Sequence, residues 1–249
     1  AQAVMPGDPT PVEPSALGFH EPMYFLVGGK DPVSARFQFS FRYRIFDEQG
    51  VVAETIPVAS GVYFGFTQTS LWGLQGESKP IRDSSFRPSL FYRWGLDDPD
   101  QRGSLALYGG YEHESNGKED MPSRSIDTLF VLPVWRTEFS NGHTLIFAPK
   151  LYGYLDKEDN PDIQRHRGYV DWKLRYGRED DWVLATQLRR GTSGHGSAQL
   201  DLSWPLRRPL FARTGGFLHF HLFKGYGESL LDYNLDRGTQ VRIGFSMVR

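Results

Sequence analysis

Residues 35–45 read Ala-Arg-Phe-Gln-Phe-Ser-Phe-Arg-Tyr-Arg-Ile. From Phe37 to Ile45 every second residue is apolar, and each residue between them is Arg, Gln or Ser. Successive side chains of a β-strand point to opposite faces. A period of two without exception therefore predicts a strand with one apolar face and one polar, largely cationic face.

The same alternation recurs along the chain and predicts an all-β protein. Twelve segments show it. A closed up-and-down barrel needs an even number of strands when both of its chain ends lie on one side, so we expect one twelve-stranded antiparallel barrel domain over residues 21–249. Residues 1–20 are Pro-rich and predict an extended tail or plug. The predicted strands are 22–29, 34–46, 60–73, 85–95, 104–115, 126–138, 144–155, 168–177, 181–190, 196–204, 216–226 and 238–248.

Composition narrows the class of protein. The formal net charge is −2, which gives no basic surface for nucleic acid, and the absence of cysteine removes disulfides and thiolate chemistry. The longest uncharged stretch, 55–76, contains Pro57 and several glycines, which excludes a membrane-spanning helix there. A transmembrane barrel stays open, because its strands are only half apolar.

Periodicity alone does not say which face of the barrel points outward. A soluble barrel has its apolar face inside, whereas a membrane barrel has it outside. Mixed charges on the polar face suit a lumen of ion pairs, and most tryptophans fall near strand ends, as in interfacial girdles. We therefore favour the transmembrane barrel. Polar segments such as 74–84, 116–125 and 156–167 follow the odd strands, whereas tight turns mostly follow the even ones; the long link 47–59 is an exception.

A candidate catalytic pair ends the fifth predicted strand. His113 and Ser115 continue the parity of the apolar Leu105 and Leu107, so both should face outward, toward lipid. Asp127 begins the next strand on the outward parity, where a carboxylate could orient the imidazole while it takes a proton from Ser115. For an arbitrary sequence, a His-x-Ser pair is more often a surface pair without chemistry.

Other polar residues carry weaker signals. His219 and His221 share a parity that should place both in the lumen; they could bind a metal, but without a third ligand nearby a polar-lumen role is favoured. Asn116-Gly117 is by itself only turn chemistry. The acids at 156–162 could hold calcium, but their spacing fits no EF-hand and favours solvated loop residues.

Three blocks of sequence resemble the outer-membrane phospholipase A family. They are Tyr-Glu-His-Glu-Ser-Asn-Gly at 111–117 with Ser-Arg-Ser at 123–125, Gln-Thr-Ser-Leu-Trp at 68–72, and Gly-Tyr-Gly-Glu-Ser-Leu-Leu-Asp-Tyr-Asn at 225–234. The resemblance covers most of the chain from about residue 23. It implies a calcium-dependent, homodimeric enzyme that cleaves acyl esters of phospholipids in the outer leaflet of a Gram-negative outer membrane.

The resemblance also implies roles for individual residues. Ser115 matches the nucleophile, His113 the base, and the amide of Gly117 an oxyanion-hole donor. Calcium ligands match the Ser123 side chain, the Lys118 carbonyl and a carbonyl aligned to Ser78 of the partner subunit, an all-oxygen set that suits Ca²⁺.

Gln68 matches a polar residue on the dimer face.

The sequence departs from the family at Asp127, where relatives usually have Asn, and at Arg249, where barrels commonly end in an aromatic residue. The Asp adds a charge at the membrane rim, which is costly unless His113 becomes cationic or calcium lies close. The rival hypothesis is a catalytically silent structural or pore-forming barrel, although a lumen crowded with charged side chains argues against a porin.

Overall fold

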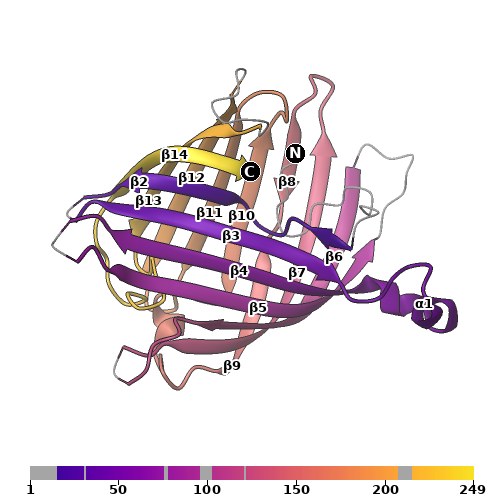
Figure 1. Ribbon diagram of the computed structural model, residues 1–249, viewed down its shortest axis with the longest axis horizontal. Helices are drawn as coiled ribbons and strands as arrows, with labels where there is room; N and C mark the ends of the chain where they lie inside the picture. Colours follow the sequence, from indigo (N-terminus) through magenta and orange to yellow (C-terminus); the bar gives the residue numbers. More distant parts are fainter. Residues whose placement is uncertain (1–15, 31, 76–77, 96–102, 121, 207–214) are drawn as a thin grey trace.

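The computed structural model describes residues 16–30, 32–75, 78–95, 103–120, 122–206 and 215–249. Its strands form one antiparallel sheet that closes into a twelve-stranded barrel, since β14 pairs with β2 (Figure 1). The strands of the ring are β2 (Met23–Gly28), β3 (Ser34–Arg44), β4 (Val62–Gly73), β5 (Ile81–Gly95), β6 (Gly103–Ser115), β7 (Ser125–Glu138), β8 (Thr144–Phe147) with β9 (Lys150–Asp156), β10 (Val170–Gly177), β11 (Val183–Arg190), β12 (Gly196–Pro205), β13 (Phe217–Gly225) and β14 (Gln240–Val248).

The twelve strands predicted from the alternation are confirmed. One of them is interrupted, because β8 and β9 both pair with β7 and β10 but are separated at Ala148 and Pro149. Proline has no N–H to donate to a strand ladder, which accounts for the gap. A two-residue strand that the alternation did not predict, β1 (Leu17–Gly18), pairs with β3.

The barrel wall is apolar outside and polar inside. On β3, the side chain of Phe39 is 54% exposed, whereas the next residue, Ser40, is 1% exposed. Leu129, Val131 and Trp135 repeat the outward pattern along β7. A barrel in water would bury these side chains, so this distribution identifies a transmembrane barrel, as predicted.

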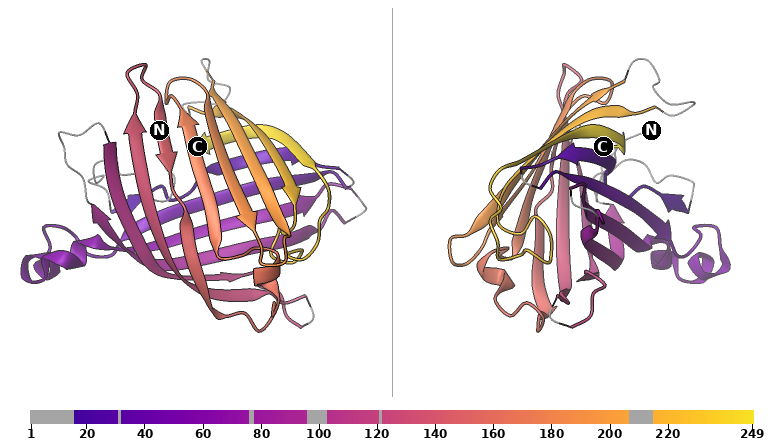
Figure 2. Two further views of the ribbon diagram at one scale, coloured as in Figure 1. Left: turned by 180° about the vertical axis from the view of Figure 1, so that it is seen from behind. Right: turned by 60° about the vertical axis from the view of Figure 1, so that its left-hand side comes forward.

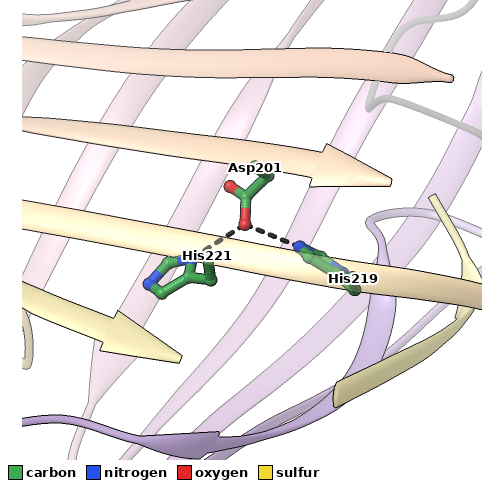
Figure 3. A group of neighbouring side chains, drawn as sticks. All are labelled: Asp201, His219 and His221. Atoms are coloured by element: carbon green, nitrogen blue, oxygen red, sulfur yellow. Dashed lines mark hydrogen bonds and ion pairs between the residues drawn. The ribbon is translucent and has the colours of Figure 1, made fainter. Parts of the chain in front are cut away.

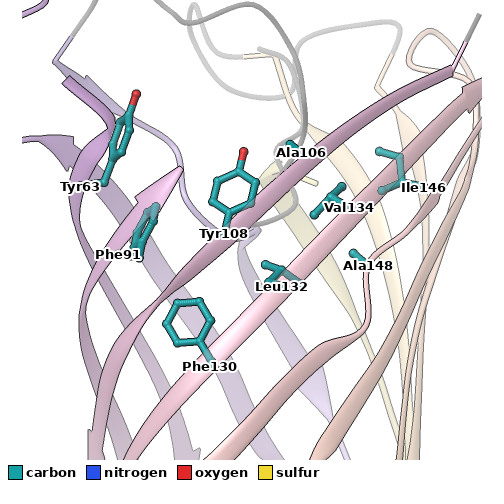
Figure 4. Close-up of a cluster of buried hydrophobic side chains, with 9 residues drawn as sticks. All are labelled: Tyr63, Phe91, Ala106, Tyr108, Phe130, Leu132, Val134, Ile146 and Ala148. Carbon is teal, nitrogen blue, oxygen red and sulfur yellow. The ribbon is translucent and has the colours of Figure 1, made fainter. Parts of the chain in front are cut away.

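The lumen differs from the prediction at one end. Ion pairs cross its polar part, including Arg87 with Glu21 at 2.6 Å and Arg189 with Asp171 at 2.7 Å. Toward the opposite end, apolar and aromatic side chains meet inside the barrel (Figure 4). This cluster consists of Tyr63, Phe91, Ala106, Tyr108, Phe130, Leu132, Val134, Ile146 and Ala148. The expectation of a lumen of paired charges is therefore correct for only part of its length.

The two rims carry different structures. The link at 47–59, unexpectedly long from the sequence, contains the helix α1 (Val51–Thr55) and the start of the 3-10 turn η1 (Pro57–Gly61). The helix α1 projects from the rim away from the wall (Figure 2). At the other rim, η2 (Ile163–Arg165) lies in the connection from β9 to β10. No helix in the described part of the chain is long and apolar enough to cross a membrane.

The chain before β2 enters the barrel. His20 stacks on Phe91 of the inner wall, and the backbone N–H of Glu21 donates to the hydroxyl of Ser40 at 3.0 Å. The predicted extended segment falls largely on residues 1–15, which lie outside the described residues.

Candidate active site

The structure brings His113 and Asp127 together on the outer face of the barrel. The two residues are direct partners in the antiparallel pairing of β6 with β7, so their side chains project from the same face. His113 Nδ1 lies 2.7 Å from Asp127 Oδ1. A carboxylate at this distance fixes the ring orientation and leaves Nε2 as the nitrogen that can exchange a proton.

Ser115 ends β6 two residues after His113, on the same outward face. Its partners in the flanking strands are Phe86 of β5 and Ser125 of β7. The serine is half-buried at the rim, where the strand passes into the loop 116–124. An imidazole and a hydroxyl therefore lie side by side where the wall meets the loops, as the alternation predicted.

Tyr111 is a site residue that the sequence did not single out. Its hydroxyl donates a hydrogen bond of 2.6 Å to Asp127 Oδ1, the same oxygen that contacts His113. Tyr111 lies two residues before His113 on the same strand, so both side chains point to the same face. This shared face was the signal in the sequence that could have identified Tyr111. The two donors account for how a carboxylate is held at a lipid-facing rim, where an unpaired charge is costly.

Asn116 organises the loop after Ser115. Its side-chain oxygen accepts hydrogen bonds from the backbone N–H groups of Lys118 at 3.3 Å and Arg124 at 3.0 Å, and its amide nitrogen donates to the Pro122 carbonyl at 2.8 Å. Asn116 was expected to contribute only turn chemistry, but its side chain is 3% exposed and binds three backbone groups of the described part of the loop.

Gly117 has the left-handed backbone conformation, with φ +65°. A β-carbon there would also lie 3.2 Å from the ring of Phe86, so glycine suits the position both conformationally and sterically.

The residues expected to bind calcium lie around the same loop. Ser123 Oγ donates to Asp159 Oδ2 at 3.0 Å, and Ser125 Oγ donates to the same oxygen at 3.1 Å. The Lys118 ammonium points to β5, where it donates to the Arg82 carbonyl at 2.5 Å. Oxygen donors with one carboxylate fit a hard cation such as Ca²⁺. Ser78 lies exposed in the connection between β4 and β5.

Of the acids at 156–162, Asp156 and Glu158 are exposed loop residues, as the sequence favoured, whereas Asp159 and Asp162 have specific partners. Asp159 accepts from the two serines, and Asp162 accepts from the Tyr233 hydroxyl at 2.5 Å. Burial and this acceptor raise the pKa of Tyr233 to about 12. Tyr233 also packs with Ile126, Ile163 and Leu230. Through Tyr233, the 226–239 segment thus contacts the loop that carries Asp159 and Asp162. This contact gives a structural role to the sequence block 225–234.

Gln68 lies on the outer face near Ser115. It is paired with Phe39 on β3 and with Phe86 on β5, and Phe86 is in turn paired with Ser115. Neighbouring strands are about 4.8 Å apart. The Gln68 amide and the Ser115 hydroxyl therefore project from the same face about 10 Å apart.

Comparison with known proteins gives a consistent family. A family model described as Phospholipase A1 matches residues 19–247. The phospholipase A1 of Escherichia coli K12 is 31% identical over 226 residues, which cover 86% of this chain and 69% of that protein.

Solved structures share the fold. Outer membrane phospholipase A from Escherichia coli superposes with a TM-score of 0.76 at 25% identity, over 93% of this chain and 98% of that one. An outer membrane phospholipase dimer from Salmonella typhi with bound calcium has a TM-score of 0.75 at 24% identity, over 96% of this chain and 94% of that one.

Proposed function

Because the chain belongs to the phospholipase A1 family, we propose that it hydrolyses acyl ester bonds of phospholipids in the outer membrane, with Ser115, His113 and Asp127 as its catalytic residues. The observation that carries this proposal is the 2.7 Å contact between His113 and Asp127 on the same lipid-facing surface as Ser115. A nucleophile on the outside of a transmembrane barrel has membrane lipid as its neighbouring substrate.

The reaction follows from the roles of these side chains. The Ser115 oxygen attacks the ester carbonyl carbon while His113 Nε2 takes the hydroxyl proton. The N–H of Gly117 donates to the resulting oxyanion. As the C–O bond breaks, His113 returns the proton to the leaving lysophospholipid, and water then hydrolyses the acyl-serine with His113 as base. The products are a fatty acid and a lysophospholipid.

Asp127 orients His113 and stabilises the imidazolium that forms during attack. Aspartate at this position is compatible with the lipid-facing rim because the Tyr111 hydroxyl and the His113 ring both contact its Oδ1 atom. In this proposal Tyr111 is a positioning residue, which acts through Asp127.

Calcium is proposed as the cofactor, held by the Ser123 side chain and the Lys118 carbonyl together with a carbonyl from the partner subunit's Ser78. The Salmonella structure is 24% identical to this chain, so its likeness supports the fold alone. The proposal for calcium therefore rests on the oxygen donors of this chain. When bound, calcium would polarise a water that assists the Gly117 amide at the oxyanion. Asn116 holds the loop that presents these groups.

Homodimerisation is proposed as the activating step. Gln68 is a polar side chain on the lipid-facing wall, and it contacts the Ser70 hydroxyl at 3.2 Å. A polar group in that setting gains more from a second protein surface than from lipid. A partner barrel seated at Gln68 would border Ser115 and form one wall of a groove for the acyl chain. We expect the site to face the outer leaflet.

The direct test is fatty-acid release from phospholipid–detergent micelles, measured with calcium and with a chelator. Ser115→Ala should abolish calcium-dependent release. The matched control is Ser104→Ala, at the opposite end of the same strand, which should retain it. Persistent release by Ser115→Ala would overturn the assignment of the nucleophile, whereas ion conductance without any lipolysis in the wild type would favour the silent pore-forming barrel.

A further inference from the structure

A second cluster of histidine and aspartate lies inside the barrel, and we propose that it is a binding site for Zn²⁺. Asp201 of β12 contacts His219 Nε2 at 2.8 Å and His221 Nδ1 at 2.7 Å, both through the same oxygen, Oδ1 (Figure 3). Asp201 and His221 are direct partners across the two strands, and His219 follows the same parity. This is the third ligand that sequence analysis did not find beside the two histidines.

The geometry of the cluster fits a small divalent ion. The three potential ligand atoms all lie within 4.8 Å of one another. A tetrahedral zinc ion with bonds of about 2.0–2.2 Å separates its ligand atoms by about 3.3 Å, so small side-chain rotations would admit the ion. Two imidazoles and one carboxylate leave a fourth position open, as in zinc sites that also bind water.

The chemistry of the ligands separates this site from the proposed calcium loop. Ca²⁺ prefers oxygen ligands alone, whereas imidazole nitrogen suits zinc and neighbouring transition metals. In the order of strands around the barrel, β12 and β13 are also far from β6 and β7. The cluster is therefore a candidate for a different metal at a different place.

The surroundings of Asp201 orient it for binding. The side-chain amide of Gln199 donates to Asp201 Oδ2 at 2.7 Å, which directs Oδ1 between the two rings. His219 and His221 are 3% and 0% exposed. Among the described residues, the far nitrogens of both rings have no hydrogen-bond partner. Both rings are thus fixed at the nitrogen that faces the carboxylate, where an ion would lie.

Two arginines near His221 have partners of their own. Arg242, the strand partner of His221, forms an ion pair with Glu228. The guanidinium of Arg36 donates to the Tyr24 hydroxyl and to the Glu228 carbonyl. Asp201 and His219 also line a lumen cavity bordered by Glu228 and Ser229 of the rim segment 226–239.

The test is zinc binding to the folded, detergent-solubilised protein. After removal of loosely bound metal, we expect about one Zn²⁺ per chain, retained in excess Ca²⁺. Co²⁺ should compete and show the visible absorption of a low-coordinate site with nitrogen ligands. Gln199→Ala should weaken zinc binding by about 10–100-fold, because it frees the carboxylate that the amide orients.

His219→Gln with His221→Gln should remove the bound zinc. The matched control is His166→Gln with His195→Gln, which removes two stacked histidines at the rim and should leave zinc binding intact. Asp201→Asn, which retains hydrogen-bonding capacity, gives a second test should the double variant fail to fold. Equal zinc binding by wild type and Asp201→Asn would overturn the site. Lipolysis is measured in parallel, and its outcome does not bear on this inference.

Discussion

The barrel contains two histidine–aspartate groups with nearly the same local geometry and opposite surroundings. At the outer rim, His113 Nδ1 lies 2.7 Å from Asp127 Oδ1; in the lumen, His221 Nδ1 lies 2.7 Å from Asp201 Oδ1. Both pairs are direct partners of adjacent antiparallel strands. The contact alone therefore does not define a catalytic group.

The face of the strand makes the difference. The outer pair shares its face with Ser115 and with lipid, whereas the inner pair shares its face with a second histidine and the charged lumen. A one-residue change of register exchanges the two faces. Strand parity is thus the feature on which we base the two proposals, hydrolysis for the outer pair and metal binding for the inner one.

The largest expected effect is a loss of phospholipid hydrolysis on mutation of the outer pair but not of the inner pair. His113→Asn should lower the rate of phospholipid hydrolysis by about 10²–10⁴-fold, since a general base is lost. His221→Asn, in the lumen, should change it little. The measurement is kcat in mixed micelles for both variants, with folding checked by circular dichroism. Equal losses would mean that the barrel as a whole, and not the outer pair, determines activity.

The two aspartates should differ in the same way. Asp127→Ala should reduce kcat by roughly tenfold or more, because His113 loses its orienting acceptor. Asp127→Asn should lose less, since the amide oxygen can accept the same hydrogen bond. Asp201→Ala serves as the control from the lumen. Unchanged turnover in Asp127→Ala would remove Asp127 from the catalytic group.

A smaller effect is expected at Tyr111, which supports only the outer pair. Tyr111→Phe removes one donor to the Asp127 carboxylate and should lower the free energy of unfolding by about 1 kcal/mol. Tyr43→Phe, another lipid-facing tyrosine, is the comparison. Denaturant titration in detergent measures both. A larger loss in Tyr43→Phe would show that the Tyr111 contact contributes little.

The smallest effect concerns another pair of histidines, His166 and His195, whose rings stack 4.8 Å apart at the rim. Burial lowers the pKa of His166 below its usual 6.5. The unfolded segment then binds more protons than the folded one, so stability should fall as the pH drops below about 6.5. Hydrogen exchange in 157–169 should rise between pH 7.5 and 5.5, after correction for intrinsic rates. His166→Gln should flatten this dependence.

Much of the fold could be predicted because alternation is a property of each strand by itself. Residues 35–45 show both the strand and its two faces. Alternation did not predict the break at Pro149, which is a local interruption of a strand. It also did not predict the two-residue strand β1, which is too short to show a period. The apolar cluster inside one end of the lumen also escaped, because it forms only when several strands come together.

For the candidate site, strand parity and the family resemblance predicted which residues share the outer face. His113, Ser115 and Asp127 lie on one face as expected. Contacts across elements could not be derived, because they depend on register and loop conformation. Asp159 reaches Ser123 from another loop, and Asp201 meets His221 only through the pairing of β12 with β13.

Covalent labelling with an apolar sulfonyl fluoride, followed by peptide mass spectrometry, tests whether Ser115 is an activated nucleophile. We expect one adduct per chain, on Ser115, which is lost in His113→Asn and retained in His221→Asn. Labelling that is absent from Ser115, or that persists unchanged in His113→Asn, would contradict a catalytic serine activated by histidine on the outer face of the barrel.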